Sequence, residues 1–119
     1  MPDLPTNSEF VPSARLDGDC IIASVHGEID LHSSPDLREM LLGALNAYRP
    51  RKIILNLSQV PYMDSSAVAV LVEALQKLRK SGGKLCLTNL QPRVRSLLEI
   101  ARLETIFVIV ASEEEAMKK

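Results

Sequence analysis

Residues 52–71 read KIILNLSQVPYMDSSAVAVL and contain the pattern that decides the fold. The first six residues are nearly all apolar, as in a strand that is covered on both faces of a parallel sheet. After a short loop, Asp-Ser-Ser at 64–66 precedes an apolar run, and Asp and Ser are preferred at helix N-termini. The segment therefore predicts a buried strand, a loop and a helix whose first turn carries two hydroxyl groups.

The two hydroxyls, Ser65 and Ser66, are expected among unpaired backbone N–H groups at the positive end of the helix dipole. An anion is tolerated at such a position, so a phosphate could be added without disrupting the fold. Phosphorylation would change the surface charge by about two units. Most Asp-Ser-Ser triplets are only helix caps, but this chemistry suits a regulatory switch better than a catalyst.

The chain has 119 residues, of which 46% are hydrophobic and only 3% aromatic, so we expect one domain with an aliphatic core. A formal net charge of −1 argues against a nucleic-acid-binding protein. Cys20 and Cys86 each lie in an apolar run without metal-ligand spacing, which favours a packing role. We expect no metal and no cofactor.

The N-terminus resembles neither a signal peptide nor a membrane anchor, and no apolar run is long enough to span a membrane. We therefore expect a cytoplasmic protein with no membrane partner. Residues 1–9 are polar and contain proline, and they are predicted to form a flexible segment before a single domain at 10–119.

Strand patterns alternate with helix patterns along the chain. The expected strands are 10–16, 20–26, 52–57, 84–88 and 106–110. The expected helices begin at Ser33 or Ser34, at Ser65, at Pro92 and after Ser112. In the third helix, Val94, Leu97, Leu98 and Ala101 are predicted to face inward. Arg93, Arg95 and Arg102 are assigned to the solvated side, with pairing to an acidic partner as the alternative. Asp-Gly-Asp at 17–19 predicts a hairpin, and the remaining alternation predicts parallel crossovers, so the fold class is α/β with a mixed, mostly parallel sheet.

In such a sheet, functional loops gather at the carboxyl ends of the parallel strands. The loop from Gly27 to Ser34 also follows a strand, so we expect Asp30 and Ser33 to lie near Ser65. The helix at 65–80 is apolar on more than one side over its first two turns. This predicts either complete burial or an exposed apolar patch that binds a partner.

Three segments together resemble the STAS domain, and specifically the bacterial anti-sigma-factor antagonists: Gly-Glu-Ile-Asp at 27–30, the strand at 53–57, and the block at 62–71. The resemblance extends from about residue 10 to 117. It implies a four- to five-stranded sheet with an antiparallel edge strand at its N-terminal end, about four helices, and no catalytic activity. It also implies that the unphosphorylated protein binds an anti-sigma factor that is a serine kinase. Phosphorylation of the first serine of the block then ends the complex, and a separate phosphatase reverses it.

Carried over residue by residue, the resemblance makes Ser65 the phosphorylated residue. Asp64 and Ser66 would shape the loop around it, and Asp30 and Ser33 would belong to the neighbouring loop of the docking surface. Ala67 and Val70 would contribute to partner binding from the helix that follows. These antagonists usually have glycine at the position of Ala67, and a methyl group there would narrow the approach of a kinase.

Two other functions are compatible with the sequence. The first is a STAS-domain adaptor in a transport or stress-sensing assembly, without a phosphorylation switch. The second is an enzyme with Ser65 as nucleophile and His26 or His32 as base, although the G-x-S-x-G motif is missing. Gly82-Gly83 follows a helix and precedes a strand, which is the wrong context for a phosphate-binding loop.

Overall fold

The computed structural model describes residue 11 and residues 13–119, so the expected flexible segment at 1–9 lies outside the described residues. The described strands form one sheet in the spatial order β1-β2-β3-β4-β5. Their bounds are β1 (Ser13–Asp17), β2 (Cys20–His26), β3 (Lys52–Gln59), β4 (Lys84–Thr88) and β5 (Val108–Val110). β1 pairs with β2 in antiparallel orientation, whereas the other three pairs are parallel, which confirms the predicted mixed sheet.

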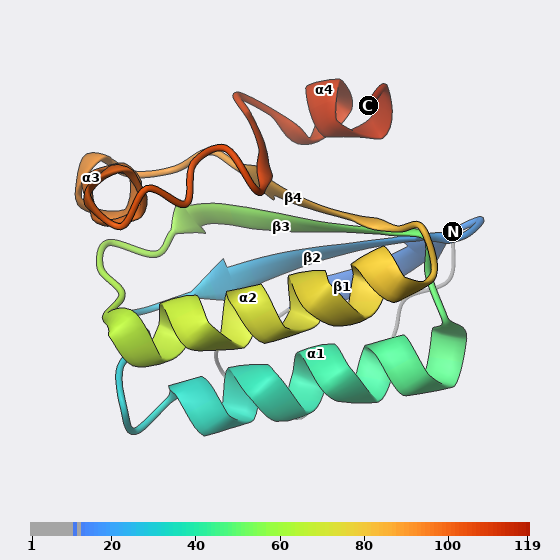
Figure 1. Cartoon of the computed structure of the whole chain (residues 1–119), viewed down its shortest axis with the longest axis horizontal. Helices are drawn as coiled ribbons and strands as arrows, with labels where there is room; N and C mark the ends of the chain where they lie inside the picture. The colour runs from blue at the N-terminus through green and yellow to red at the C-terminus, as the bar shows by residue number, and fades with distance from the viewer. Residues whose placement is uncertain (1–10, 12) are drawn as a thin grey trace.

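Four helices pack around this sheet within the described part of the chain. Their bounds are α1 (Ser34–Tyr48), α2 (Ser65–Lys80), α3 (Pro92–Ile100) and α4 (Glu113–Met117). α1 and α2 lie side by side on one face, α4 lies on the opposite face, and α3 lies at the end of the sheet where β3 stops (Figure 1). The N-terminus of α2 is at that same end of the sheet.

Alternate residues of the central strands supply two separate apolar layers, as the period of two requires. The larger layer faces α1 and α2, and its fully buried residues from β3 are Ile53, Leu55 and Leu57. The smaller layer, which includes Ile54 and Cys86, packs against Ala116 of α4. β3 is therefore covered on both faces, as its nearly continuous apolar sequence predicts.

Both ends of the 65–80 helix agree with the sequence prediction. α2 begins at Ser65 after the N-cap Asp64 and ends before Gly82, whose φ of 79° suits the turn that leads into β4. Its last turn carries Lys77, Arg79 and Lys80, which favour the negative end of the helix dipole.

Two expected elements differ at their ends. The last strand is Val108–Val110 rather than 106–110, because Ile106 still belongs to the preceding turn, where its N–H donates to the carbonyl of Leu103 (3.2 Å), and pairing with β4 begins only at Val108. α3 ends at Ile100, so Ala101 is exposed instead of facing inward. The strand expected at 10–16 lies partly outside the described residues, and in the described part β1 covers Ser13–Asp17, one residue beyond the expected end.

No helix among residues 13–119 combines the length and the apolar character needed to cross a membrane.

Candidate functional site

Backbone hydrogen bonds join the 27–34 loop to the segment that precedes α2. Ile29 N–H donates to the carbonyl of Tyr62 (3.1 Å), and Asp64 N–H donates to the carbonyl of Ile29 (3.0 Å). Ile29 and Met63 thereby form a parallel bridge beyond the ends of β2 and β3. The two loops predicted to meet at this end of the sheet are in direct contact.

Asp64 is the residue that organises the start of α2. Its Oδ1 accepts hydrogen bonds from the N–H of Ser66 (2.9 Å), from the N–H of Ala67 (3.3 Å) and from the hydroxyl of Ser66. The pKa of Asp64 is lowered, first by the Ser66 hydroxyl and further by backbone N–H groups that include that of Leu31. The carboxylate is therefore ionised at neutral pH and fixed between the two loops.

This arrangement changes one expectation about the first turn of α2. The N–H groups of Ser66 and Ala67 are not free for an external anion, because Asp64 already accepts their hydrogen bonds. The next N–H, that of Val68, donates to the main-chain carbonyl of Asp64 at 3.2 Å. The positive end of α2 is thus largely neutralised by the chain's own carboxylate.

Ser65 itself is exposed at the first position of α2. His26 and His32 are also exposed, and neither makes a hydrogen bond to Ser65 in the described structure. A serine nucleophile needs a base within hydrogen-bond reach. The geometry therefore offers an accessible hydroxyl without the partner that an enzyme of this type requires.

Asp30 and Ser33 lie in the expected loop, where their side chains form hydrogen bonds with main-chain groups of the same loop and with each other. The Asp30 carboxylate accepts from the N–H of His32 (2.9 Å) and of Ser33 (3.2 Å), and the His32 N–H is the main cause of the lowered pKa of Asp30. The Ser33 hydroxyl accepts from Asp30 N–H (2.9 Å) and donates to the carbonyl of Glu28 (3.1 Å). Ser33 is buried, so it shapes the loop and does not cap α1 through its side chain.

Ala67 and Val70, which were expected to contribute to partner binding, are 0% and 7% exposed and belong to the core beneath α2. The methyl group of Ala67 points into the protein, so it does not narrow the approach to Ser65. Sequence periodicity left this side of the helix open to two interpretations, and in the structure Ala67 and Val70 are buried whereas Ala69 is exposed.

An open hollow lies beside Ser65, between the start of α2 and α3. Its lining comprises Tyr62, Met63, Asp64, Ser65, Pro92, Arg93, Ser96, Leu97 and Ile100. The guanidinium of Arg93 lies over the ring of Tyr62, with its carbon 4.8 Å from the ring centroid, a cation–π contact. The sequence predicted that Arg93 lies on the solvated side of its helix or pairs with an acidic partner, but it did not predict a position near Ser65, because no local signal indicates which loop α3 will face.

Two large apolar side chains are exposed at this end of the molecule. Leu31, in the 27–34 loop, is 73% exposed, and Ile100, at the end of α3, is 82% exposed. Ile100 also lines the hollow, whereas Leu31 lies in the turn that leads into α1. Both side chains are available for contact with another protein.

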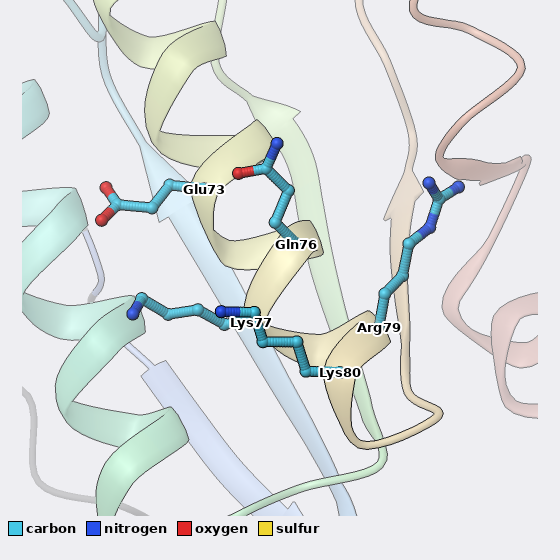
Figure 2. A pocket seen from close by; sticks show the side chains of 5 residues that line it. All are labelled: Glu73, Gln76, Lys77, Arg79 and Lys80. Atoms are coloured by element: carbon cyan, nitrogen blue, oxygen red, sulfur yellow. The ribbon is translucent and has the colours of Figure 1, made fainter.

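A second hollow on the exposed face of α2 does not form a comparable site. Figure 2 shows that its lining side chains do not converge: Glu73 and Lys77 extend toward α1, whereas Arg79 extends to the other side of the helix, and Gln76 and Lys80 complete the lining. Glu73 is engaged by Arg38 of α1 in a two-pronged ion pair (2.8 and 2.9 Å). Residue 11 and residues 13–119 also contain no cluster of three or more potential metal-ligating side chains.

Comparison with known sequences identifies relatives over most of the chain. The family model described as the STAS domain matches residues 11–116. The anti-sigma-B factor antagonist of Bacillus subtilis is 37% identical over 94 residues, which cover 79% of this chain and 84% of that protein.

Solved structures show the same fold. A crystal structure of a Thermotoga maritima protein superposes with a TM-score of 0.82 at 24% identity, covering 92% of this chain and 93% of the other. The anti-sigma factor antagonist SpoIIAA superposes at 24% identity in two states. Its unphosphorylated form has a TM-score of 0.69 (87% and 91% covered), and its phosphorylated form from Bacillus has one of 0.70 (88% and 95% covered).

Anti-sigma factor antagonists are regulatory proteins and not enzymes. The chain belongs to the STAS domain family, and within it to the anti-sigma factor antagonists.

Proposed function

We propose that this protein binds an anti-sigma factor with serine kinase activity and that phosphorylation of Ser65 ends the complex. The observation that carries the proposal is an exposed Ser65 hydroxyl directly beside the fixed, ionised carboxylate of Asp64. SpoIIAA, which shares the fold, exists in a phosphorylated and an unphosphorylated form.

The switch is electrostatic. A phosphate on Ser65 adds about two negative charges next to Asp64. The first-turn N–H groups of Ser66 and Ala67 cannot compensate this charge, because they already donate to Asp64. A partner that covers the site must then desolvate two neighbouring anionic groups. A coupling of about 3 kcal/mol weakens binding more than a hundredfold, which is sufficient for regulation.

The docking surface in this proposal surrounds Ser65. Leu31 and Ile100 supply exposed apolar area, and Asp64 and Asp30 supply negative charge. A partner with apolar side chains and a basic rim would be complementary to this surface. Ser33, being buried, acts only through the loop that it holds.

Ser66 has a supporting role in the same proposal. Its hydroxyl donates to Asp64 and is only partly exposed, so it is the poorer phosphate acceptor of the two serines. The presence of Ala67 in place of glycine gave the adaptor alternative additional support, and the burial of its methyl group removes that support. In the complete cycle, a serine phosphatase restores the binding state, and the cycle takes place in the cytoplasm.

The test is to incubate the protein with ATP and each anti-sigma factor of the same genome that carries a serine kinase domain. We expect a mass gain of one phosphate that maps to Ser65, is lost in Ser65→Ala and is retained in Ser66→Ala. Binding to the same kinase should weaken at least a hundredfold in Ser65→Asp but little in the uncharged Ser65→Asn. Stable binding to another assembly without phosphorylation would refute the switch and identify an adaptor.

A further inference from the structure

The hollow beside Ser65 contains a positive charge to which the proposed function gives no role. Arg93 is the second residue of α3, and among the residues that line this hollow it is the only cationic one. In the described part of the chain, the ion pairs are Arg15 with Glu113 and Arg38 with Glu73, so Arg93 has no carboxylate partner there. Its guanidinium instead lies over the ring of Tyr62.

A phosphate on Ser65 would need hydrogen-bond donors, and α2 offers few. The N–H groups of Ser66, Ala67 and Val68 all donate to atoms of Asp64. A dianion at this position is therefore repelled by a neighbouring carboxylate while most of the donors of the helix terminus are occupied. Its stabilisation has to come from another element that faces the same space.

We propose that Arg93 is the receptor for the phosphate of phosphorylated Ser65, leaving the face of Tyr62 to bind it. This inference rests on the proposed function and specifies how the phosphorylated state is stabilised. In the modification, the γ-phosphoryl group of ATP is transferred to Ser65 Oγ as its bond to ADP breaks, and the hydroxyl proton is released. The guanidinium then offers two parallel N–H donors to two phosphate oxygens.

The consequence is a bridge between the start of α2 and the start of α3 that exists only in the phosphorylated protein. The cation–π contact that Arg93 gives up is weak at an exposed site, whereas the two hydrogen bonds that it gains join a cation to a dianion and belong to the stronger class. The exchange is therefore favourable. It also exposes the ring of Tyr62 and removes a positive charge from the surface around Ser65.

The experiment uses the full chain with phosphoserine incorporated at position 65 during translation, so it does not depend on any kinase. The pKa of the phosphate is followed by phosphorus NMR as a function of pH. The charged side chains that line the hollow are Arg93, which lowers this pKa, and Asp64, which raises it. We expect Arg93→Ala to raise the phosphate pKa by about half a unit or more, with Arg93→Lys intermediate.

Arg95→Ala is the matched control, because Arg95 is an exposed arginine of the same helix that does not line the hollow. It should leave the phosphate pKa unchanged. Equal titration curves for the unsubstituted protein, Arg93→Ala and Arg95→Ala would overturn the inference while leaving the proposed function intact. If no kinase phosphorylates Ser65 but the phosphate pKa still depends on Arg93, the proposed function is refuted and the inference about Arg93 is supported.

Discussion

Replacement of Asp64 by alanine tests the view that this carboxylate organises the start of α2. The substitution removes the acceptor for the N–H groups of Ser66 (2.9 Å) and Ala67 (3.3 Å) and for the Ser66 hydroxyl. Loss of an N-cap costs about 1 kcal/mol and up to about 2. Loss of a negative charge at the helix N-terminus adds about 0.3–1 kcal/mol. We therefore expect Asp64→Ala to lower the free energy of unfolding by about 2 kcal/mol.

The matched variant is Asp64→Asn, which keeps an oxygen acceptor but removes the charge. Asn is as good an N-cap as Asp, so only the charge contribution of about 0.5 kcal/mol should be lost. For a chain of this length, 1 kcal/mol corresponds to about 4 °C in Tm. Thermal and urea unfolding should then show Tm lowered by about 8 °C in Asp64→Ala and by about 2 °C in Asp64→Asn.

The pH dependence of the free energy of unfolding also tests the role of Asp64. The pKa of Asp64 is lowered in the folded protein, first by the Ser66 hydroxyl. Its stabilising contribution is therefore complete above the unfolded pKa of about 3.9 and is lost as the pH falls through the folded value. The stability difference between the unsubstituted protein and Asp64→Ala should shrink below about pH 4. A difference below about 0.3 kcal/mol at pH 7, or one that is equal at pH 7 and pH 3, would refute the reasoning.

Three further predictions concern the rest of the fold. Gly83→Ala should destabilise the folded protein by about 1–3 kcal/mol, because its Cβ would lie 2.7 Å from a backbone carbonyl oxygen. Gly43→Ala, in open space on α1, should instead stabilise it by up to about 1 kcal/mol. Urea unfolding of both variants tests these two values. Burial raises the pKa of Cys20 to about 11 and also raises that of Cys86, so both thiols should resist labelling at pH 8 until the protein unfolds, and rapid labelling of the native protein would contradict this. Glu113→Ala should lower Tm, because Glu113 accepts hydrogen bonds from two side chains of the sheet (2.8 and 3.1 Å), and an unchanged Tm would show that these two hydrogen bonds do not stabilise the fold.

The sequence by itself determined which elements form and where the site lies. The apolar run of β3 and the periodic pattern of α2 are local properties of the chain, and so is the cap that Asp64 provides between them. Because each depends on neighbouring residues, periodicity and capping preferences are sufficient to predict them. The order of strands and helices likewise predicted that the 27–34 loop and Ser65 would lie at one end of the sheet.

Only the tertiary structure decided which faces are covered and which donors are occupied. Ala67 and Val70 are buried because core residues pack beneath that side of α2, and helical spacing alone cannot reveal this. Arg93 and Ser65 line the same hollow because α3 packs at the end of the sheet where α2 begins, although 28 positions (93 − 65) separate the two residues in the sequence. Such contacts depend on the packing of distant elements, whereas sequence patterns describe each element separately.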